Sequence, residues 1–404
     1  MKIPFSLPYI DKSVINEVND SLINTGWLTS GPKVKELENE LQNIIDSKYI
    51  LCVNSWTSGA QLILRWLGVG PGDEVIIPAY TYSATALCIM NLGAKPIMVD
   101  VRNDFTIDPD LVLKKINKKT KAIIPVDIGG LPCDYELINK IVKSIEVKKI
   151  FIPKSPIQKK IRRPIVIGDA AHSIGAIYKN KYLGSHTDIS IFSFHSVKNL
   201  TTGEGGAIAL NLPDNFNNEK VFKDLKILGL NGQTKSAFQK NKIGGWRYDI
   251  IDQGLKINMP DICAAIGLAQ SKIYLTKLLP ERKKIFSFYN TFFKKKHWAI
   301  IPKSIEKFRE SSYHLYLLRI KNIDENKRDL IINYISKKGV GVNVHYIPMP
   351  MLTLFKKNKY DIKEFNNTYN LYKNEITLPV YNNLKPNELK IICDVVSEAC
   401  EKII

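Results

Sequence analysis

The chain has 404 residues, of which 45% are hydrophobic and 24% charged, as expected of a globular protein with two domains or one large domain and a smaller partner. Its formal net charge of +19 would suit nucleic acid, an anionic membrane surface or an anionic small molecule. The lysines are scattered without aromatic residues interleaved on one face, so we expect no nucleic-acid binding, and an anionic small-molecule substrate fits the charge equally well.

We expect no membrane insertion. The longest weakly charged stretch, 75–90, is shorter than the roughly 20 residues of a spanning helix and contains Pro78. Residues 1–9 lack the apolar core of a secretory signal. The six cysteines form no CxxC pair, and several lie in apolar runs, so reduced thiols in a cytoplasmic protein are the simplest interpretation.

Through the first two-thirds, short apolar runs alternate with amphipathic segments, which predicts an α/β fold with a mostly parallel sheet. The expected elements, in chain order, are a helix at 58–67, a turn at 68–73, strands at 74–78 and 96–100, a helix at 108–116, and strands at 122–126, 164–168 and 189–194. The glycines of the turn follow a helix and precede a strand, the reverse of a dinucleotide fingerprint. The basic, proline-containing stretch 148–163 is expected to be a solvated loop.

After about residue 280 the pattern changes. A long amphipathic helix is expected to open at Glu281, followed by shorter strands at 313–320 and 340–345 and a closing helix from Pro386. The sequence therefore predicts a large α/β domain at 1–280 and a smaller C-terminal α/β domain at 281–404.

Three polar segments follow predicted strands. The first, at 54–60, carries Thr57 and Ser58 between a strand and a helix, where hydroxyls and free N–H groups can bind phosphate, although simple helix capping is equally compatible. In the second, Asp169 follows a strand of Ile and Val, at the sheet edge where α/β proteins bind ligands. His172 lies three residues later. The alternatives are a helix cap for Asp169 and a structural role for His172.

The third segment places Lys198 after an apolar strand and before a turn rich in hydroxyls and glycine, at 192–206. A lysine that forms a Schiff base requires such a setting, held by a strand end and partly shielded from water. Taken alone, the pattern fits a surface lysine of a lysine-rich chain better.

Taken together, the three segments resemble the DegT/DnrJ/EryC1/StrS family of sugar aminotransferases, which have the fold type I architecture of pyridoxal phosphate (PLP) enzymes. The segment Phe194-His195-x-x-Lys198 and the following 202–206 are highly specific to that family, and the similarity extends from Tyr9 almost to the C-terminus. Supporting matches are at 70–78, 169–172, 259–262 and 344–346.

The resemblance implies a role for each matching residue. Lys198 would hold the cofactor and move the proton, Asp169 would pair with the pyridine nitrogen, and His172 would lie near the phenolic oxygen. The remaining cofactor contacts would come from Thr57, Ser58 and Ser193 at the phosphate, Tyr82 on the ring, and Lys256 at the phosphate of a partner subunit. No metal ligand is implied.

Two segments depart from the family pattern. Trp56 replaces the usual glycine beside the phosphate loop and could reshape the sugar side of the pocket. Lys256 and Asn258 replace the Asn and Arg that the family donates across its dimer interface; a lysine can still serve a phosphate as a point charge. Candidates for sugar contacts, with core packing at least as plausible, are Trp56, Tyr313, His314, His345 and Tyr346.

The resemblance further implies a homodimer and a ping-pong reaction, in which L-glutamate converts PLP to pyridoxamine phosphate (PMP) and the amino group then passes to a nucleotide-linked keto sugar. A UDP-4-keto-6-deoxyhexose is the preferred substrate. The alternatives are a PMP-dependent sugar dehydratase, which would carry His in place of Lys198, and a non-catalytic relative, which would have lost Lys198 or Asp169.

Overall fold

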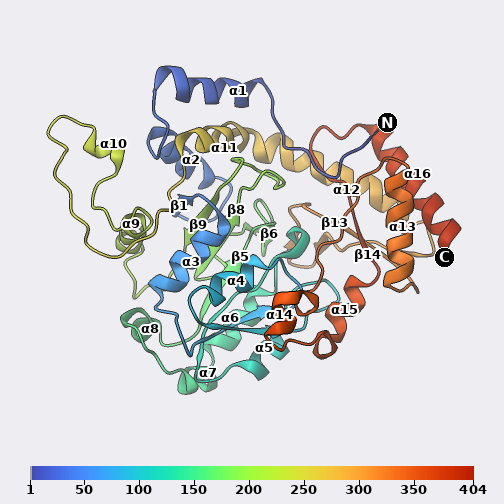
Figure 1. Cartoon of the computed structure of the whole chain (residues 1–404), viewed down its shortest axis with the longest axis horizontal. Helices are drawn as coiled ribbons and strands as arrows, with labels where there is room; N and C mark the ends of the chain where they lie inside the picture. Colours follow the sequence, from blue (N-terminus) through green and yellow to red (C-terminus); the bar gives the residue numbers. More distant parts are fainter. Residues whose placement is uncertain (1) are drawn as a thin grey trace.

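The computed structural model describes residues 2–404, and its centre is a seven-stranded sheet surrounded by helices (Figure 1). In the order β1-β9-β8-β5-β4-β2-β3, the strands are β1 (Tyr49–Val53), β9 (Gly206–Leu210), β8 (Ile189–Ser193), β5 (Ile165–Asp169), β4 (Thr120–Ile123), β2 (Glu74–Pro78) and β3 (Lys95–Val99). From β8 to β3 all neighbours are parallel, whereas β9 is antiparallel to both β8 and β1. The predicted α/β fold with a mostly parallel sheet is therefore confirmed.

Alternate residues of a strand enter different hydrophobic clusters, because they point to opposite faces of the sheet. In β2, Val75 and Ile77 pack in one cluster and Ile76 in another. The helices that complete these clusters are α2 (Pro32–Leu41), α3 (Trp56–Trp66), α4 (Ala84–Met90), α5 (Pro109–Lys115), α6 (Tyr135–Lys143), α7 (Ile145–Ile150), α8 (Pro156–Ile161), α9 (Asn218–Leu228) and α11 (Asp261–Ile273). Burial on both faces explains why the strands are continuous apolar runs.

The strand ends bring the polar segments to one edge of the sheet. β5 ends at Asp169 and the parallel β8 at Ser193. Gly206 pairs with both Ser193 and Val53, so the end of β1 and the start of α3 lie at the same edge. Ligands of α/β folds bind at this carboxyl edge.

The C-terminal part packs around a three-stranded antiparallel sheet of order β10-β13-β14. Its elements are β10 (Ala299–Ile300), β13 (Tyr316–Ile320), β14 (Glu375–Leu378), α12 (Leu279–Phe293), α13 (Glu325–Lys337), α14 (Thr353–Lys357), α15 (Asn366–Tyr372) and α16 (Pro386–Ile403). A small sheet of order β11-β12-β6-β7 joins the two parts: β11 (Ile305–Glu306), β12 (Arg309–Glu310), β6 (Ile177–Tyr178) and β7 (Lys181–Tyr182). The division between residues 280 and 281 stays a prediction.

Two segments lie on the outside of this framework. Helix α1 (Lys12–Asn19) runs across the top of the view in Figure 1 and contacts α11. Residues 229–256, which include the short helix α10 (Ala237–Lys240), extend away from the rest of the chain as an arm.

The predicted strand at 340–345 is wrong. Val340 makes an isolated parallel bridge with Ile3, and Asn343 an isolated antiparallel bridge with Thr377. Because the two bridges run to different partners in different directions, no continuous ladder forms.

The basic stretch 148–163 is also not the solvated loop that we predicted. Helix α7 continues to Ile150, and α8 occupies the second half of the stretch. Ser155 caps α8, and the buried Gln158 donates to the carbonyls of Leu67 and Gly68 at 3.0 and 3.3 Å. These contacts anchor a segment that composition alone places in solvent.

The helix predicted to open at Glu281 begins much earlier. α11, a π-helical turn at Tyr274–Leu278 and α12 form one helical run from Asp261 to Phe293. By length and composition alone this run could cross a membrane, with a mean hydropathy of 1.2 in its most apolar window. Half of that window is buried inside the protein, as in the core helix of a globular protein. Core packing therefore accounts for its apolar composition.

Candidate active site

A tight turn after β8 holds Lys198 at the carboxyl edge of the sheet. The backbone N–H of Lys198 donates to the His195 carbonyl at 2.9 Å. The Phe194 carbonyl accepts from the N–H of Thr202 at 2.9 Å and from the hydroxyl of Thr201 at 3.0 Å. These bonds tie the polar run back to the strand and fix the point from which the Lys198 side chain leaves.

The side chain of Lys198 is half-buried, and its Nζ has neither a hydrogen-bond acceptor nor an ion-pair partner among residues 2–404. Burial disfavours the ammonium form and lowers the pKa of Lys198 to about 8, although the charge of Asp169 opposes this shift. The amine is therefore half neutral near pH 8, and the neutral form is the nucleophile.

We expect this lowered pKa to appear in chemical labelling. With limiting acetic anhydride, acetylation of Lys198 in the cofactor-free protein should rise with pH and reach half its maximum near pH 8. Peptide mass spectrometry measures the modification, and Lys220, exposed on α9, is the internal control. The same pH dependence for both lysines would contradict a perturbed amine at Lys198.

Asp169 presents a buried carboxylate at the end of β5. Thr85 Oγ1 donates to its Oδ2 at 3.0 Å, and the N–H of Ala171 donates to its Oδ1 at 3.2 Å. Burial raises the pKa of Asp169 to about 7, while these two donors and the charge of Lys198 act in the opposite direction. A cationic ring nitrogen placed against this carboxylate would stabilise its ionised form.

His172 is buried and neutral. Its Nδ1 accepts from the N–H of Gly129 at 3.3 Å, and its Nε2 lies 3.1 Å from the hydroxyl of Tyr346. The bond to Nδ1 assigns the proton to Nε2, which therefore donates to Tyr346. Burial lowers the pKa of His172 well below its usual range. His172 is thus a fixed hydrogen-bonding group at neutral pH.

The start of α3 forms a cradle of backbone donors. Ser55 Oγ caps the helix by accepting from the Ser58 N–H at 3.1 Å, and Ser58 Oγ donates to Asn54 Oδ1 at 2.5 Å. The amides of Trp56 and Thr57 occupy the first two helical positions, where a helix offers no acceptor. Such N–H groups at a helix N-terminus suit a phosphate.

Gly206 brings this cradle against Ser193. A Cβ at Gly206 would lie 2.6 Å from the Phe192 carbonyl oxygen and 2.9 Å from the Trp56 amide nitrogen, so a larger residue does not fit. The buried Ser193 is the ladder partner of Gly206. Thr57, Ser58 and Ser193 therefore lie on segments that meet at this edge, and their role at a phosphate stays a prediction.

The other predicted cofactor residues lie differently. Tyr82 is 60% exposed, with its ring 5.6 Å from that of Tyr346, and is available for stacking. The exposed Lys256 donates through Nζ to Asn258, whose amide donates to Ser30 Oγ at 2.6 Å. Within residues 2–404 no hydrogen bond joins Lys256 to the phosphate cradle. A role for Lys256 in a partner's site stays a prediction.

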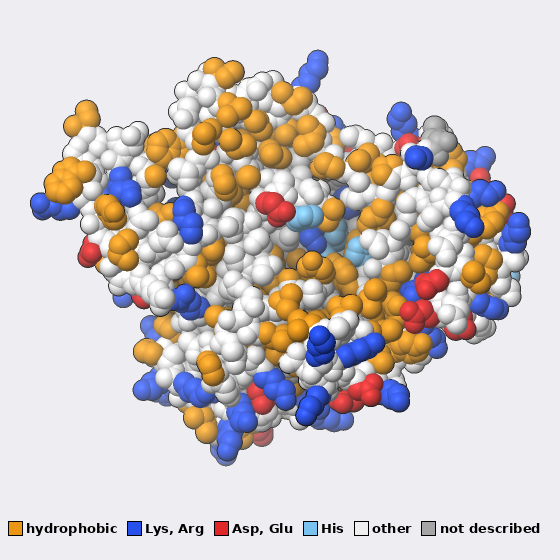
Figure 2. Space-filling view, in the orientation of Figure 1, with side chains coloured by type: hydrophobic (Ala, Val, Ile, Leu, Met, Phe, Trp, Pro, Cys, Tyr) orange, Lys and Arg blue, Asp and Glu red, His pale blue; other side chains and the backbone are white. Residues whose placement is uncertain are grey.

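A small cavity adjoins the Lys198 turn. His314, His345 and Tyr346 line it together with Lys198, as do residues that no motif had indicated, Phe5 and Arg282. In Figure 2, histidine side chains gather near the centre of the visible face beside apolar groups. Phe5 and Arg282 were missed because they come from chain segments far from the motifs.

Two of the suggested sugar contacts are core residues instead. Trp56 is buried in a hydrophobic cluster with its indole nitrogen lacking a partner among residues 2–404. Tyr313 is also buried, and its hydroxyl donates to Glu310 at 2.7 Å. Neither side chain lines the Lys198 cavity.

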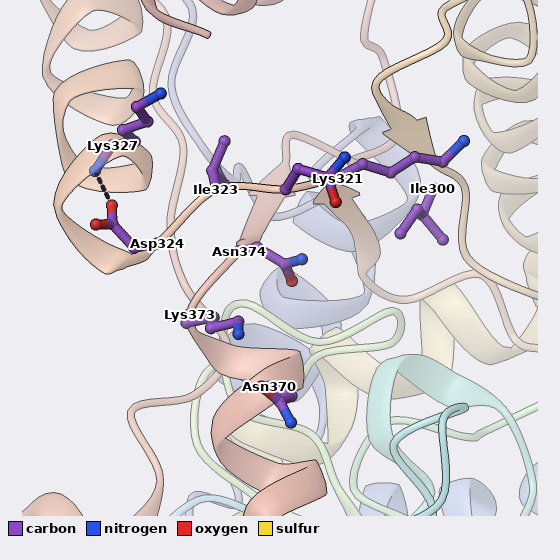
Figure 3. A pocket seen from close by; sticks show the side chains of 9 residues that line it. Ile300, Lys321, Ile323, Asp324, Lys327, Asn370, Lys373 and Asn374 are labelled. Atoms are coloured by element: carbon purple, nitrogen blue, oxygen red, sulfur yellow. Dashed lines mark hydrogen bonds between the residues drawn. The ribbon is translucent and has the colours of Figure 1, made fainter.

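A larger hollow lies on the C-terminal part between β10, α13 and α15 (Figure 3). Its lining consists of lysines, amides, two isoleucines and Asp324, which caps α13 by accepting from the Lys327 N–H at 2.9 Å. It contains no histidine, cysteine or buried charged side chain. The Lys198 edge is therefore the better candidate for catalysis.

The fold and the site define an α/β enzyme of the aminotransferase class. The sequence profile of the DegT/DnrJ/EryC1/StrS aminotransferase family matches residues 8–152 and 157–397, so the chain belongs to that family. The resemblance seen in the motifs, the enzyme class and the fold are thereby confirmed.

Individual relatives cover nearly the whole chain. The spore coat polysaccharide biosynthesis protein SpsC of Bacillus subtilis is 32% identical over 98% of this chain and 96% of its own. The UDP-4-amino-4,6-dideoxy-N-acetyl-beta-L-altrosamine transaminase of Campylobacter jejuni is 32% identical over 99% and 98%. Among solved structures, Streptococcus pneumoniae Spr1654 in its PMP form, described as a candidate sugar aminotransferase, is 40% identical with a TM-score of 0.94 over 100% of both chains.

Proposed function

We propose that this protein transfers an amino group from L-glutamate to the keto carbon of a nucleotide-linked sugar, with PLP as its cofactor. The observation that carries the proposal is the perturbed amine of Lys198 at the same sheet edge as the buried carboxylate of Asp169. Structures of Spr1654 in PLP and PMP forms support the cofactor, and the name of the Campylobacter jejuni relative supports a UDP-linked sugar.

The donor set of the site fits PLP. Asp169 would hold the pyridine nitrogen, because a buried carboxylate without a cationic hydrogen-bond partner gains most from a protonated ring. Thr57, Ser58 and Ser193, with the free amides of α3, would hold the phosphate. Since Ser58 Oγ already donates to Asn54, that hydroxyl would have to reorient.

Two further residues would position the pyridine ring of PLP. Tyr82, exposed beside Tyr346, would cover one face of the ring, and His172 would lie near the phenolic oxygen with its proton on Nε2. When bound, PLP supplies an electron sink for the reacting amine. Lys198 Nζ, half neutral near pH 8, can then take a proton from the substrate carbon and return it.

The preferred acceptor is a UDP-4-keto-6-deoxyhexose. The net charge of +19 favours capture of a pyrophosphate-bearing substrate through long-range attraction. SpsC, whose name refers to spore coat polysaccharide, supports a role in making amino sugars for a surface glycan. The six cysteines are all unpaired, which supports a reducing compartment such as the cytoplasm.

The alternatives are not favoured. A PMP-dependent sugar dehydratase would carry His at position 198, and the lysine present there has the lowered pKa of a nucleophile. A non-catalytic relative would have no need of a desolvated amine beside a buried carboxylate, because each charge costs free energy to bury.

We expect a homodimer with the active site at its interface. The arm at 229–256 carries a cluster of exposed large apolar side chains: Phe238, Ile243, Trp246, Tyr248, Ile250 and Ile251. Apolar groups also cover the region around α1 in Figure 2. Large apolar side chains gathered on one exposed segment are typical of protein–protein contacts, so a second copy is the occupant that we propose.

Adding charge to the arm should therefore separate the subunits. The double variant Ile243→Asp/Trp246→Asp is expected to elute with half the mass of the wild type in size-exclusion chromatography with light scattering. Ile145→Asp, on α7, is the control because Ile145 is 66% exposed, close to the 70% of Trp246, and it should keep the wild-type mass. A wild type that is fully active at the mass of one chain would exclude the dimer and the role of Lys256 across it.

The reaction itself can be tested in two steps. PLP-loaded protein mixed with L-glutamate should lose the visible absorbance of the bound cofactor and release 2-oxoglutarate. The product mixture, after removal of glutamate, should convert a UDP-4-keto-6-deoxyhexose into its amino sugar, detected by mass spectrometry. No response to any amino donor would reject amino transfer, whereas a response to glutamate without sugar amination would reject only the proposed acceptor.

A further inference from the structure

Three polar groups form a chain of hydrogen bonds from β14 to the Lys198 cavity. Thr377 Oγ1 donates to Glu375 Oε1 at 2.5 Å and lies 3.0 Å from His345 Nδ1. The backbone N–H of His345 donates to Glu375 Oε2 at 3.1 Å. Because Nδ1 is engaged on the strand side, Nε2 is the ring nitrogen left for the cavity that His345 lines with Lys198.

The backbone and one aromatic ring hold this chain of bonds in place. Glu375 and Thr377 are two residues apart on β14 and share one face, whereas Ile376 and Leu378 point into the C-terminal core. Thr377 and Asn343 exchange backbone hydrogen bonds of 3.1 and 2.7 Å, which fix the segment before His345. The ring of Phe5 stacks on His345 with centroids 5.4 Å apart.

Glu375 is a fully buried carboxyl group without an ion-pair partner among residues 2–404. The charged groups that act on it are Arg319 from β13 and Arg328 from α13, and the buried hydroxyl of Tyr80 faces the same region. Burial raises the pKa of Glu375 to about 8, because it outweighs the donors Thr377 and His345 and both arginines. On the cavity side, Lys198 is the charged group that acts on His345.

We propose that Glu375, acting through Thr377, selects which nitrogen of His345 carries the proton. With Glu375 ionised, Thr377 donates to Glu375 and accepts from Nδ1–H, so Nε2 is an acceptor in the cavity. With Glu375 protonated, its O–H donates to Thr377, Thr377 donates to Nδ1, and Nε2–H is a donor. Between the two states the Nδ1 proton passes to Thr377, the Thr377 hydroxyl proton passes to Glu375, and Nε2 takes up one proton from the cavity, so the imidazole stays neutral in both states.

The imidazole can respond in this way because it does not titrate in the same range. Burial and the charge of Lys198 lower the pKa of His345 to about 3, so the ring is neutral from pH 6 to 10. Glu375 is therefore a positioning residue that sets the character of Nε2 without touching the cavity. Below about pH 8, Nε2–H can donate to a substrate oxygen; above it, Nε2 can only accept a hydrogen bond.

The tautomer can be observed directly in the cofactor-free protein. Long-range 1H–15N spectra of protein labelled with [15N]histidine distinguish Nδ1–H from Nε2–H, and loss of one signal in His345→Gln assigns the residue. In the wild type we expect His345 to change from Nε2–H to Nδ1–H as the pH rises through about 8. A tautomer that stays the same from pH 6 to 10 would overturn the proposal.

Variants distinguish the proposed relay, formed by Glu375, Thr377 and His345, from a general disturbance of strand β14. In Glu375→Gln the amide donates to Thr377 at every pH, so His345 should stay Nε2–H throughout. Thr377→Val should abolish the transition and Thr377→Ser should restore it, while Ile376→Val, which alters the opposite face of β14, should leave it unchanged. A transition that persists in Glu375→Gln would also overturn the proposal.

The consequence for catalysis rests on the proposed aminotransferase function. There the pH profile of the sugar half-reaction should contain two ionisations near pH 8, those of Glu375 and Lys198, and only that of Lys198 should remain in Glu375→Gln. The spectra need neither cofactor nor substrate. A failure of the proposed relay can therefore be distinguished from a failure of the proposed aminotransferase function. A pH-dependent tautomer without amino transfer rejects the function alone, whereas amino transfer with a fixed tautomer rejects the relay alone.

Discussion

Replacing Lys198 by alanine is expected to lower the rate of amino transfer by at least about 10³-fold, because the variant loses both the nucleophile and the group that moves the proton. Among residues 2–404 no other lysine lines the Lys198 cavity, and the exposed Lys256 donates to Asn258 instead. The measurement is single-turnover formation of 2-oxoglutarate from L-glutamate by protein saturated with PLP.

A control variant and a labelling experiment accompany this measurement. Lys220→Ala removes an exposed lysine on α9 and should keep the wild-type rate. Borohydride reduction of the PLP-loaded wild type should attach the cofactor to the peptide that contains Lys198, and the attachment should be absent in Lys198→Ala. A variant that retains more than a tenth of the wild-type rate would show that another residue carries the proton.

Replacing Asp169 by asparagine is expected to slow the reaction by about 10²–10³-fold, comparable to the loss of one preorganised electrostatic partner at a transition state. The substitution keeps the size of the side chain but removes the charge that would hold a protonated pyridine nitrogen. It also places an amide opposite Thr85 and Ala171, which in the wild type donate hydrogen bonds to the carboxylate. PLP affinity should fall as well, which a fluorescence titration measures.

The control for this variant must separate charge from geometry. Thr85→Val removes the 3.0 Å bond to Asp169 but keeps the carboxylate, so we expect a much smaller loss of rate. Asp214→Asn, at an exposed residue, should change neither rate nor affinity. Equal losses in Thr85→Val and Asp169→Asn would mean that orientation matters more than charge at this position.

The polar ends of the buried strands were predictable from sequence because each lies at the change from a continuous apolar run to a polar one. This change marked Asp169 at the end of β5 and Lys198 after β8, and the helix start marked Thr57. Parallel pairing then places such ends at one edge, so the main elements of the candidate site could be inferred without coordinates. The family motifs assigned their chemistry.

Local patterns were less informative wherever a distant partner decides the structure. The stretch 148–163 is basic in composition, but Gln158 is anchored by the carbonyls of Leu67 and Gly68, which lie 91 and 90 residues earlier in the chain. The helix expected at Glu281 is continuous with α11, because its buried face continues through the π-helical turn. Neither the Gln158 contacts nor the buried face of the long helix can be predicted from local composition.

The sequence by itself determined the fold class, the strand ends and the identity of the reactive side chains, since these depend on short apolar runs and local motifs. Only the tertiary structure decided how those side chains are tuned. Burial sets the pKa values of Lys198 and Asp169, and Glu375 reaches His345 only because β14 packs beside residue 343. Desolvation and hydrogen bonding depend on groups that are close in space but distant in the chain, and no local pattern records them.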